Sequence, residues 1–263
     1  MAFPAVGRTK DTENLADQAY FAIRDKILRG VLRLGAPVSS RSLAQELGMS
    51  HLPVSQALRK LEGEGFLESR PRAGTRVRVP TEQDVIDRYE VREALETQAA
   101  RLFAAKASAR QRREMLRMGG QLDALFKRAA SGVHDSEFLY AVHSYHLDLH
   151  MKIAEYAGCK ALRDLIERNH ILTFNWFYDV ATHRDALPPR FHTDLMESLV
   201  SGDVSEADRA MRAHIGYGRE ERIRRIQLEA PTEWRERRVQ EGADAKQNPK
   251  SLPARTRRSA FGR

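Results

Sequence analysis

Residues 39–79, SSRSLAQELGMSHLPVSQALRKLEGEGFLESRPRAGTRVRV, contain two short helical patterns, a glycine turn between them and a basic hairpin pattern. Ser39 or Ser40 is a suitable N-cap for the first helix, and Gly48 supplies the backbone freedom for a sharp turn. Ser50 is the expected N-cap of the second helix. This order of elements predicts a winged helix-turn-helix.

The second helix of this pair has two faces of different chemistry. Its apolar positions recur at the i, i+3, i+4, i+7 spacing of one buried face: Val54, Ala57, Leu58 and Leu61. Its hydrogen-bonding and cationic positions lie opposite: His51, Ser55, Gln56, Arg59 and Lys60. A helix with an apolar back and a polar, cationic front suits the major groove of DNA.

A basic hairpin is expected after this helix, which Gly63 and Gly65 should end. Strands are predicted at residues 66–70 and 75–79, with a turn at 71–74. Four arginines along the hairpin form a candidate phosphate clamp: Arg70, Arg72, Arg76 and Arg78. The alternative is a hairpin that only packs, with solvated arginines. The agreement of apolar back, polar front and basic wing favours DNA binding.

Residues 23–77 closely resemble the DNA-binding domain of GntR-family bacterial transcriptional regulators. In that family the recognition helix usually opens with Ser-Arg-Thr-Pro-Val-Arg-Glu-Ala-Leu, whereas residues 50–58 here are Ser-His-Leu-Pro-Val-Ser-Gln-Ala-Leu. Two arginines are therefore missing, one of them where Ser55 stands. The resemblance implies that Arg41 and Arg59 touch the operator. The DNA-binding residues predicted from pattern and resemblance together are Arg41, Ser50, His51, Ser55, Gln56, Arg59, Arg72 and Gly74.

Charge is unevenly spread along the 263 residues, a length that favours two domains plus tails. Residues 1–80 carry 13 Lys and Arg against 8 Asp and Glu, residues 81–230 carry 22 against 24, and residues 231–263 carry 9 against 4. The positive charge therefore lies at the two ends. This predicts a polyanion partner there and a ligand-binding role between them.

The location of the protein can also be predicted. Cys159 is the single cysteine, which excludes an internal disulfide and fits a reducing cytosol. No apolar run approaches membrane-spanning length, and the first residues lack the charged-then-apolar order of a signal peptide. We expect a soluble cytoplasmic protein with no membrane partner.

Four segments are expected along the chain. Residues 1–12 and 231–263 are predicted to be disordered, and the second of these is a basic tail that adds nonspecific DNA affinity. Residues 13–80 form the winged helix domain, and residues 81–230 form an all-helical domain. The fold class is therefore mainly α, with an N-terminal winged helix-turn-helix followed by a helical bundle.

The helical domain should begin at Thr81, which forms a near capping box with Asp84. Apolar residues recur with helical periodicity throughout it, and no strand-like alternation is present. Breaks divide it into six or so helices: Ser108, Ser131–Gly132, Gly158, Leu187–Pro189 and Gly202–Asp203. A bundle of this kind can hold a site among inward-facing side chains.

Histidines cluster in this domain. His146 and His150 project from one helix face one turn apart, a spacing that lets two imidazoles share a metal ion. His192 and His214, from other helices, are the candidates for further ligands. On spacing alone, a surface pair or a satisfied core pair is the commoner case.

Residues 81–229 also resemble, in patches, the FCD ligand-binding domain attached to the FadR subfamily of GntR regulators. The patches are VREALE at 91–96, LHMKIAEYAG at 149–158, Phe191-His192 and ADRAMRAHI at 207–215. Many FCD domains bind a divalent metal through an Asp, a His four positions later and two further His. His150, His192 and His214 match the three histidines, and His146 stands at the Asp position. An all-imidazole set favours Zn²⁺ or Ni²⁺.

The predicted function is a homodimeric, DNA-binding transcriptional regulator whose operator affinity is controlled by a small carboxylate metabolite. The resemblance places Arg92 at the effector pocket, where its guanidinium could hold a carboxylate. An exposed helix arginine is the commoner alternative. Two other functions stay open: a metal-dependent enzyme that activates water, and an architectural DNA-binding protein without an effector. The enzyme is disfavoured, because no acidic residue shares the face of His146 and His150.

Overall fold

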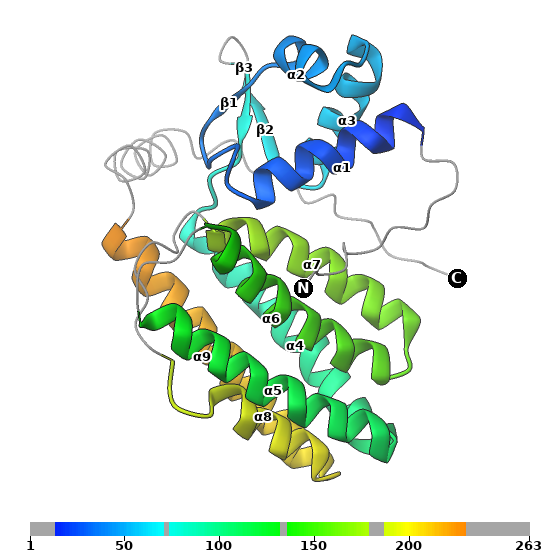
Figure 1. Cartoon of the computed structure of the whole chain (residues 1–263), viewed down its shortest axis with the longest axis vertical. Helices are drawn as coiled ribbons and strands as arrows, with labels where there is room; N and C mark the ends of the chain where they lie inside the picture. Colours follow the sequence, from blue (N-terminus) through cyan, green and yellow to red (C-terminus); the bar gives the residue numbers. More distant parts are fainter. Residues whose placement is uncertain (1–13, 71–73, 132–135, 179–186, 230–263) are drawn as a thin grey trace, which may run out of the picture. The chain divides into compact units, whose positions relative to one another are not determined.

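The computed structural model describes residues 14–70, 74–131, 136–178 and 187–229. Within these ranges the chain forms nine helices and one three-stranded antiparallel sheet (Figure 1). None of the helices in these ranges has the length and apolar character needed to span a membrane. The two tails predicted to be disordered lie outside the described residues.

The N-terminal part is the predicted winged helix-turn-helix, which confirms the fold class. The elements run in the order α1 (Leu15–Leu28), β1 (Pro37–Val38), α2 (Ser40–Leu47), α3 (His51–Gly63), β2 (Leu67–Arg70) and β3 (Gly74–Val77). The sheet order is β1-β3-β2, with both pairs antiparallel. β1 was not predicted, because a two-residue strand is too short to show a period in the sequence.

The core of the winged helix lies between α1, α3 and the sheet. α3 contributes the apolar face predicted for it, and α1 contributes Ala19, Tyr20, Ile23 and Ile27. The helical spacing of Leu15, Ala19, Ile23 and Ile27 predicts one buried face for this helix, but Leu15 is 56% exposed. It is the first helical residue, so no preceding turn covers it. Tyr20 completes the buried face of α1 instead.

The ends of α2 and α3 explain the sharp turn between them. Ser39 caps α2 by accepting a hydrogen bond from the backbone N–H of Ser42 at 3.2 Å. Gly48 ends α2 with φ of 62°, in the left-handed region that favours glycine. Ser50 occupies the N-cap position of α3, but its side chain makes no capping hydrogen bond. The predicted N-cap position of Ser50 is therefore confirmed, although its exposed side chain does not bond the helix.

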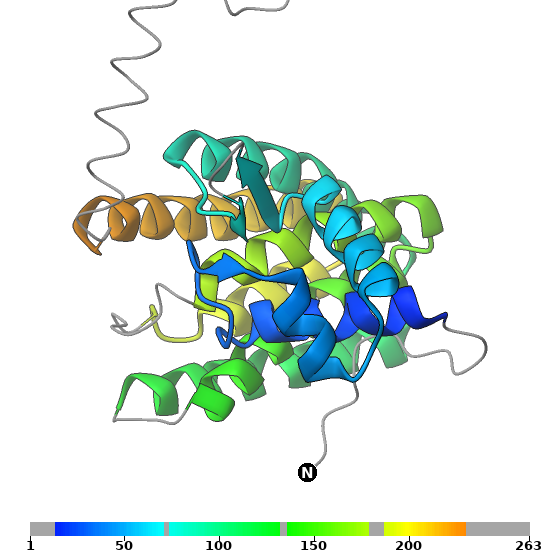
Figure 2. The same ribbon diagram turned by 90° about the horizontal axis from the view of Figure 1, so that it is seen from above.

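The second part is a bundle of six helices in the described ranges, and every predicted break falls between two of them. The helices are α4 (Glu82–Lys106), α5 (Ala109–Ala130), α6 (Ser136–Tyr156), α7 (Lys160–Tyr178), α8 (Phe191–Val200) and α9 (Val204–Glu229). The capping box at Thr81 and Asp84 is present at the start of α4, so this prediction is confirmed. Figure 2 shows α4 and α9 side by side, where Arg212 and Arg219 donate to Glu93 and Glu90.

α5 and α8 cross at very close range, and a glycine permits it. A Cβ atom on Gly119 would lie 2.8 Å from Cγ of Met196 and 3.0 Å from the backbone oxygen of His192. The backbone atom cannot move aside as a flexible side chain can. On the neighbouring Gly120, a Cβ atom would meet only Oγ1 of Thr193 at 4.0 Å. Gly119 therefore sets how closely α8 can approach α5.

These two glycines give a matched pair of substitutions. Gly119→Ala should lower the free energy of unfolding by about 1–3 kcal/mol, because the added methyl group overpacks the crossing. Gly120→Ala should raise it by about 0.5–1 kcal/mol, since alanine restricts the unfolded chain and has room here. Urea unfolding of both variants measures the difference. Equal effects would show that the crossing tolerates a Cβ atom.

Candidate functional site

The structure brings the four predicted histidines together from three helices. His146 and His150 lie on α6, His192 lies at the start of α8 and His214 lies on α9. Nε2 of His150 is 3.0 Å from Nε2 of His146 and 3.3 Å from Nε2 of His214. The ligand atoms offered by His146, His192 and His214 all lie within 4.8 Å of one another. Residues far apart in the sequence therefore present their ring nitrogens to one point.

This arrangement fits a metal ion by two observations. Zinc–nitrogen bonds are about 2.0–2.1 Å long, so two nitrogens on one tetrahedral ion lie about 3.3 Å apart. The two Nε2–Nε2 distances around His150 are close to this value. In addition, Nε2 of His192 is buried without a hydrogen-bond partner. Buried polar atoms are rarely left unpaired, and a bound ion would satisfy this one.

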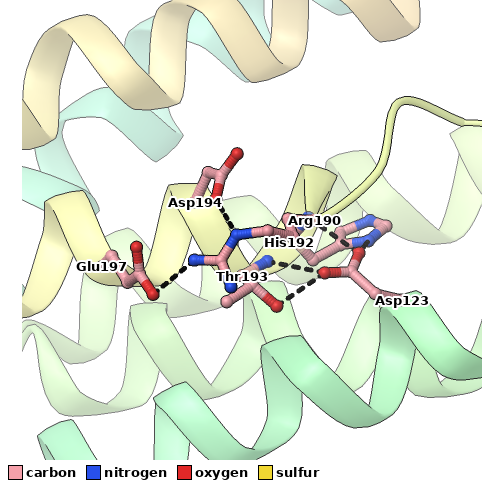
Figure 3. A network of polar contacts seen from close by, with 6 residues as sticks. All are labelled: Asp123, Arg190, His192, Thr193, Asp194 and Glu197. Atoms are coloured by element: carbon pink, nitrogen blue, oxygen red, sulfur yellow. Dashed lines mark hydrogen bonds and ion pairs between the residues drawn. The ribbon is translucent and has the colours of Figure 1, made fainter.

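Asp123 of α5 fixes the orientation of His192 (Figure 3). Its Oδ1 accepts from the backbone N–H of His192 at 2.9 Å and lies 2.8 Å from Nδ1 of the same residue. Its Oδ2 accepts from the backbone N–H and the hydroxyl of Thr193, at 2.9 and 2.6 Å. Because an ionised carboxylate only accepts, Nδ1 of His192 must carry the proton and Nε2 keeps a lone pair.

The pKa of Asp123 agrees with this assignment. Burial raises the pKa of the carboxyl group, but hydrogen bonds from His192 and Thr193 outweigh burial and hold the pKa well below its usual range. The carboxylate is therefore ionised at any physiological pH. A carboxylate behind a ligating histidine is a common way to orient the ring and raise its basicity.

Glu96 and Arg92 of α4 support His150 in a similar way. Oε2 of Glu96 lies 2.5 Å from Nδ1 of His150, and Oε1 accepts from Nε of Arg92 at 2.6 Å. Arg92 is only 5% exposed, so the alternative of an exposed helix arginine is wrong. Burial lowers the pKa of Arg92, but the charge of Glu96 outweighs this and raises it. The effector-binding role of Arg92 stays a prediction.

Three of the four imidazoles, those of His146, His192 and His214, have lowered pKa values that favour the neutral form, which is the form that binds metals. Burial lowers the pKa of His146 and of His214 well below the usual value, and the neighbouring histidines lower both further. Burial also lowers the pKa of His192, although Asp123 opposes it. Two aromatic rings pack against the cluster. The ring centroids of Phe126 and His192 are 5.2 Å apart, and those of Phe191 and His214 are 4.7 Å apart, in stacked arrangements.

Three residues of this site were not predicted: Glu96, Asp123 and Phe126. Glu96 stands four positions after Arg92, and this spacing of opposite charges on one helix was a usable signal. Asp123 and Phe126 give no such signal, because their partners lie on other helices. Only the folded chain brings them to the histidines.

The predicted DNA-binding residues lie on the exposed side of the winged helix, as far as the structure describes them. Arg41 is exposed on α2, and Gly74 begins β3 with φ of 77°. A Cβ atom on Gly74 would meet nothing within 4 Å, so the backbone of the wing is open to a close approach. His51, Gln56 and Arg59 are exposed on α3. Arg72 lies outside the described residues.

Ser55 is only partly exposed and is tied to its surroundings. Its hydroxyl lies 3.3 Å from the hydroxyl of Ser40 on α2 and 3.1 Å from Nδ1 of His51. These contacts link the start of α2 to the first turn of α3. The short side chain at position 55 therefore steadies the ring of His51.

Comparisons with known proteins agree with both parts of the chain. Residues 15–77 match the family model described as bacterial regulatory proteins, gntR family, and residues 87–217 match the FCD domain model. The probable D-xylose utilization operon transcriptional repressor of Paenarthrobacter nicotinovorans is 30% identical over 205 residues, which cover 76% of this chain and 85% of that protein.

Two further matches extend the comparison. The HTH-type transcriptional repressor RspR of Escherichia coli (strain K12) is 25% identical over 210 residues, which cover 78% of this chain and 87% of that protein. The structure of E. coli McbR/YncC shares the fold, with a TM-score of 0.65 and 18% identity, over 82% of this chain and all of that one.

The neutral histidines predict a pH dependence of stability. With chelator present, the protein should lose stability as the pH falls below about 6.5. In this range the histidines of the unfolded chain bind protons, whereas the buried rings, whose pKa is lowered, do not. His146→Gln should reduce this slope, whereas His51→Gln, at an exposed position on α3, should leave it unchanged. Unfolding midpoints from about pH 5 to 8 measure the slopes. Identical slopes for all three proteins would contradict the assignment.

Proposed function

The chain belongs to the GntR family of bacterial regulatory proteins and carries an FCD domain, and on this basis we propose that it is a homodimeric regulator controlled by a metal-bound carboxylate metabolite. Its relatives are transcriptional regulators and not enzymes. The winged helix binds the operator, and the helical bundle binds metal and effector. Effector binding to the bundle changes operator binding by the winged helix, and this change regulates transcription.

DNA binding is supported by the exposed face of α3. His51, Gln56 and Arg59 lie on the side opposite the buried residues, in the helix that such domains insert into the major groove. One recognition helix reads only a short half-site. A two-fold dimer doubles this reading, so the operator is a palindrome or nearly so.

Metal binding is supported above all by the buried, unpaired Nε2 of His192. The ligand atoms that His146, His192 and His214 offer lie within 4.8 Å of one another, and Nε2 of His150 is close to Nε2 of both His146 and His214. Uncharged nitrogen ligands suit Zn²⁺ or Ni²⁺ better than Mg²⁺ or Ca²⁺, which prefer oxygen. We assign His146, His150, His192 and His214 as the ligands. When bound, the ion would supply the positive charge that attracts an anionic effector.

The charges around the cluster support an anionic effector that depends on the metal. The structure places one positive side chain, Arg92, and two negative ones, Glu96 and Asp123, against or next to the histidines. Without an ion this set carries a net negative charge, which repels an anion. A divalent ion makes it positive, so a carboxylate is attracted only to the loaded site.

A sugar is the second candidate for the effector. It is favoured by one relative, whose name connects that protein with a D-xylose utilization operon. Titrating organic acids and D-xylose against the protein–DNA complex, with and without metal, separates the two classes. If an organic acid weakens or strengthens DNA binding only when the protein is loaded with metal, the result supports a carboxylate effector.

Metal content tests the ligand set. Protein resupplied with Zn²⁺ or Ni²⁺ and then dialysed should hold about one ion per subunit. His192→Ala should abolish this occupancy, and Asp123→Asn should weaken metal binding by about 10–100-fold, because it removes the orienting carboxylate. His143→Ala is the control on α6, and it should keep the ion. Elemental analysis showing no ion in the resupplied wild type would refute the metal site.

Arg59 tests the DNA-binding face. Arg59→Ala should weaken binding to the selected operator by about 1–3 kcal/mol and binding to random DNA much less, if the guanidinium contacts a base. Arg33→Ala, which removes an exposed arginine outside α3, should leave the preference for the operator unchanged. Fluorescence anisotropy at one fixed salt concentration compares the two DNAs. Equal losses on both would make Arg59 a phosphate contact.

A further inference from the structure

The first turn of α3 exposes a large apolar side chain. Leu52 is 64% exposed, although its neighbours Pro53 and Val54 are buried. A single exposed leucine is common on protein surfaces and does not by itself indicate a site. Its position on the helix is what distinguishes Leu52.

Leu52 lies at the N-terminal end of α3, on the helix face that points away from the core. Leu52, Gln56 and Arg59 follow the i, i+4, i+7 spacing of one helix face, and all three are exposed. The opposite face is buried and consists of Val54, Ala57, Leu58 and Leu61. The leucine therefore stands in line with two residues assigned to DNA contact. N-terminal residues of a recognition helix are those that reach the base edges.

We propose that Leu52 determines specificity by contacting the C5-methyl group of a thymine in the operator. The inference rests on the proposed DNA-binding function and deepens it. Among the groups that base pairs present in the major groove, the thymine methyl is the apolar one, and aliphatic side chains recognise it by contact. Burying Leu52 against this methyl group removes apolar surface of both partners from water.

The surroundings of Leu52 favour DNA over a protein as its partner. The exposed positions around it on α3 are polar or charged: His51, Gln56, Arg59, Lys60 and Glu62. A protein-docking surface would need a larger apolar patch than one side chain supplies. Leu52 is thus a single apolar side chain surrounded by hydrogen-bonding and charged side chains. A thymine likewise presents a single methyl group in the otherwise polar surroundings of the major groove.

Replacing single thymines by deoxyuracil tests this contact, because uracil lacks only the C5-methyl group. The operator is first obtained by selection from random DNA, and each thymine is then replaced in turn in both half-sites. At one thymine position in each half-site, the change to uracil should weaken DNA binding by the wild type about fourfold per half-site. This is the effect expected from one methyl group that is no longer buried. Leu52→Ala should bind thymine and uracil equally at that position.

Val31→Ala is the matched control, because Val31 is also 64% exposed but lies outside α3. It should keep the sensitivity of the wild type to uracil. Measurement at low salt keeps all variants bound through phosphate contacts. Repeating the selection with Leu52→Ala gives a second readout, in which the preference for thymine at that position should disappear.

The outcomes separate this inference from the function on which it rests. A wild type that selects no DNA sequence would contradict the proposed function itself. A wild type that binds its operator but is indifferent to every uracil, or a Leu52→Ala variant that keeps the full uracil effect, overturns the role of Leu52 alone.

Discussion

The contact between Asp123 and the start of α8 is the constraint on which the histidine cluster depends. The first backbone N–H groups of a helix have no partner within it, and this carboxylate accepts two of them, from His192 and Thr193. Its negative charge also suits the positive end of the helix dipole. Gly119, one turn earlier on α5, leaves the room for this approach. One helix therefore supplies both the space and the carboxylate that orient His192.

A second carboxylate repeats this arrangement from another helix. Glu96 contacts Nδ1 of His150 as Asp123 contacts Nδ1 of His192, and in both residues Nε2 is the atom left to the cluster. Arg92 balances the charge of Glu96 but not that of Asp123. The two carboxylates behind the rings thus carry an excess of one negative charge that Arg92 does not balance. In a buried site such an excess favours a cation, which agrees with the proposed ion.

The sequence was informative where structure depends on neighbouring residues, and uninformative where it depends on distant ones. The breaks between the helices of the bundle were predicted, because Gly, Pro and capping residues act locally. The four histidines were found from their spacing and from the resemblance, but the carboxylates behind two of them were not. Asp123 acquires its role only when α8 meets α5. Ser50 takes the predicted N-cap position without a capping bond from its side chain, since a residue type does not determine a side-chain orientation.

The outward-facing side of α3 departs from the family pattern at four positions, His51, Leu52, Ser55 and Gln56, while its buried face keeps the apolar spacing. These two faces are under different constraints, because only the buried one must fit the core formed with α1 and the sheet. The exposed one has no packing of this kind to preserve. His51 and Ser55 are linked, however, since the hydroxyl of Ser55 contacts both the His51 ring and the hydroxyl of Ser40. An arginine at position 55 would break this link and release the ring. Position 55 therefore bears on the orientation of the His51 ring, so these two departures are coupled by direct contact.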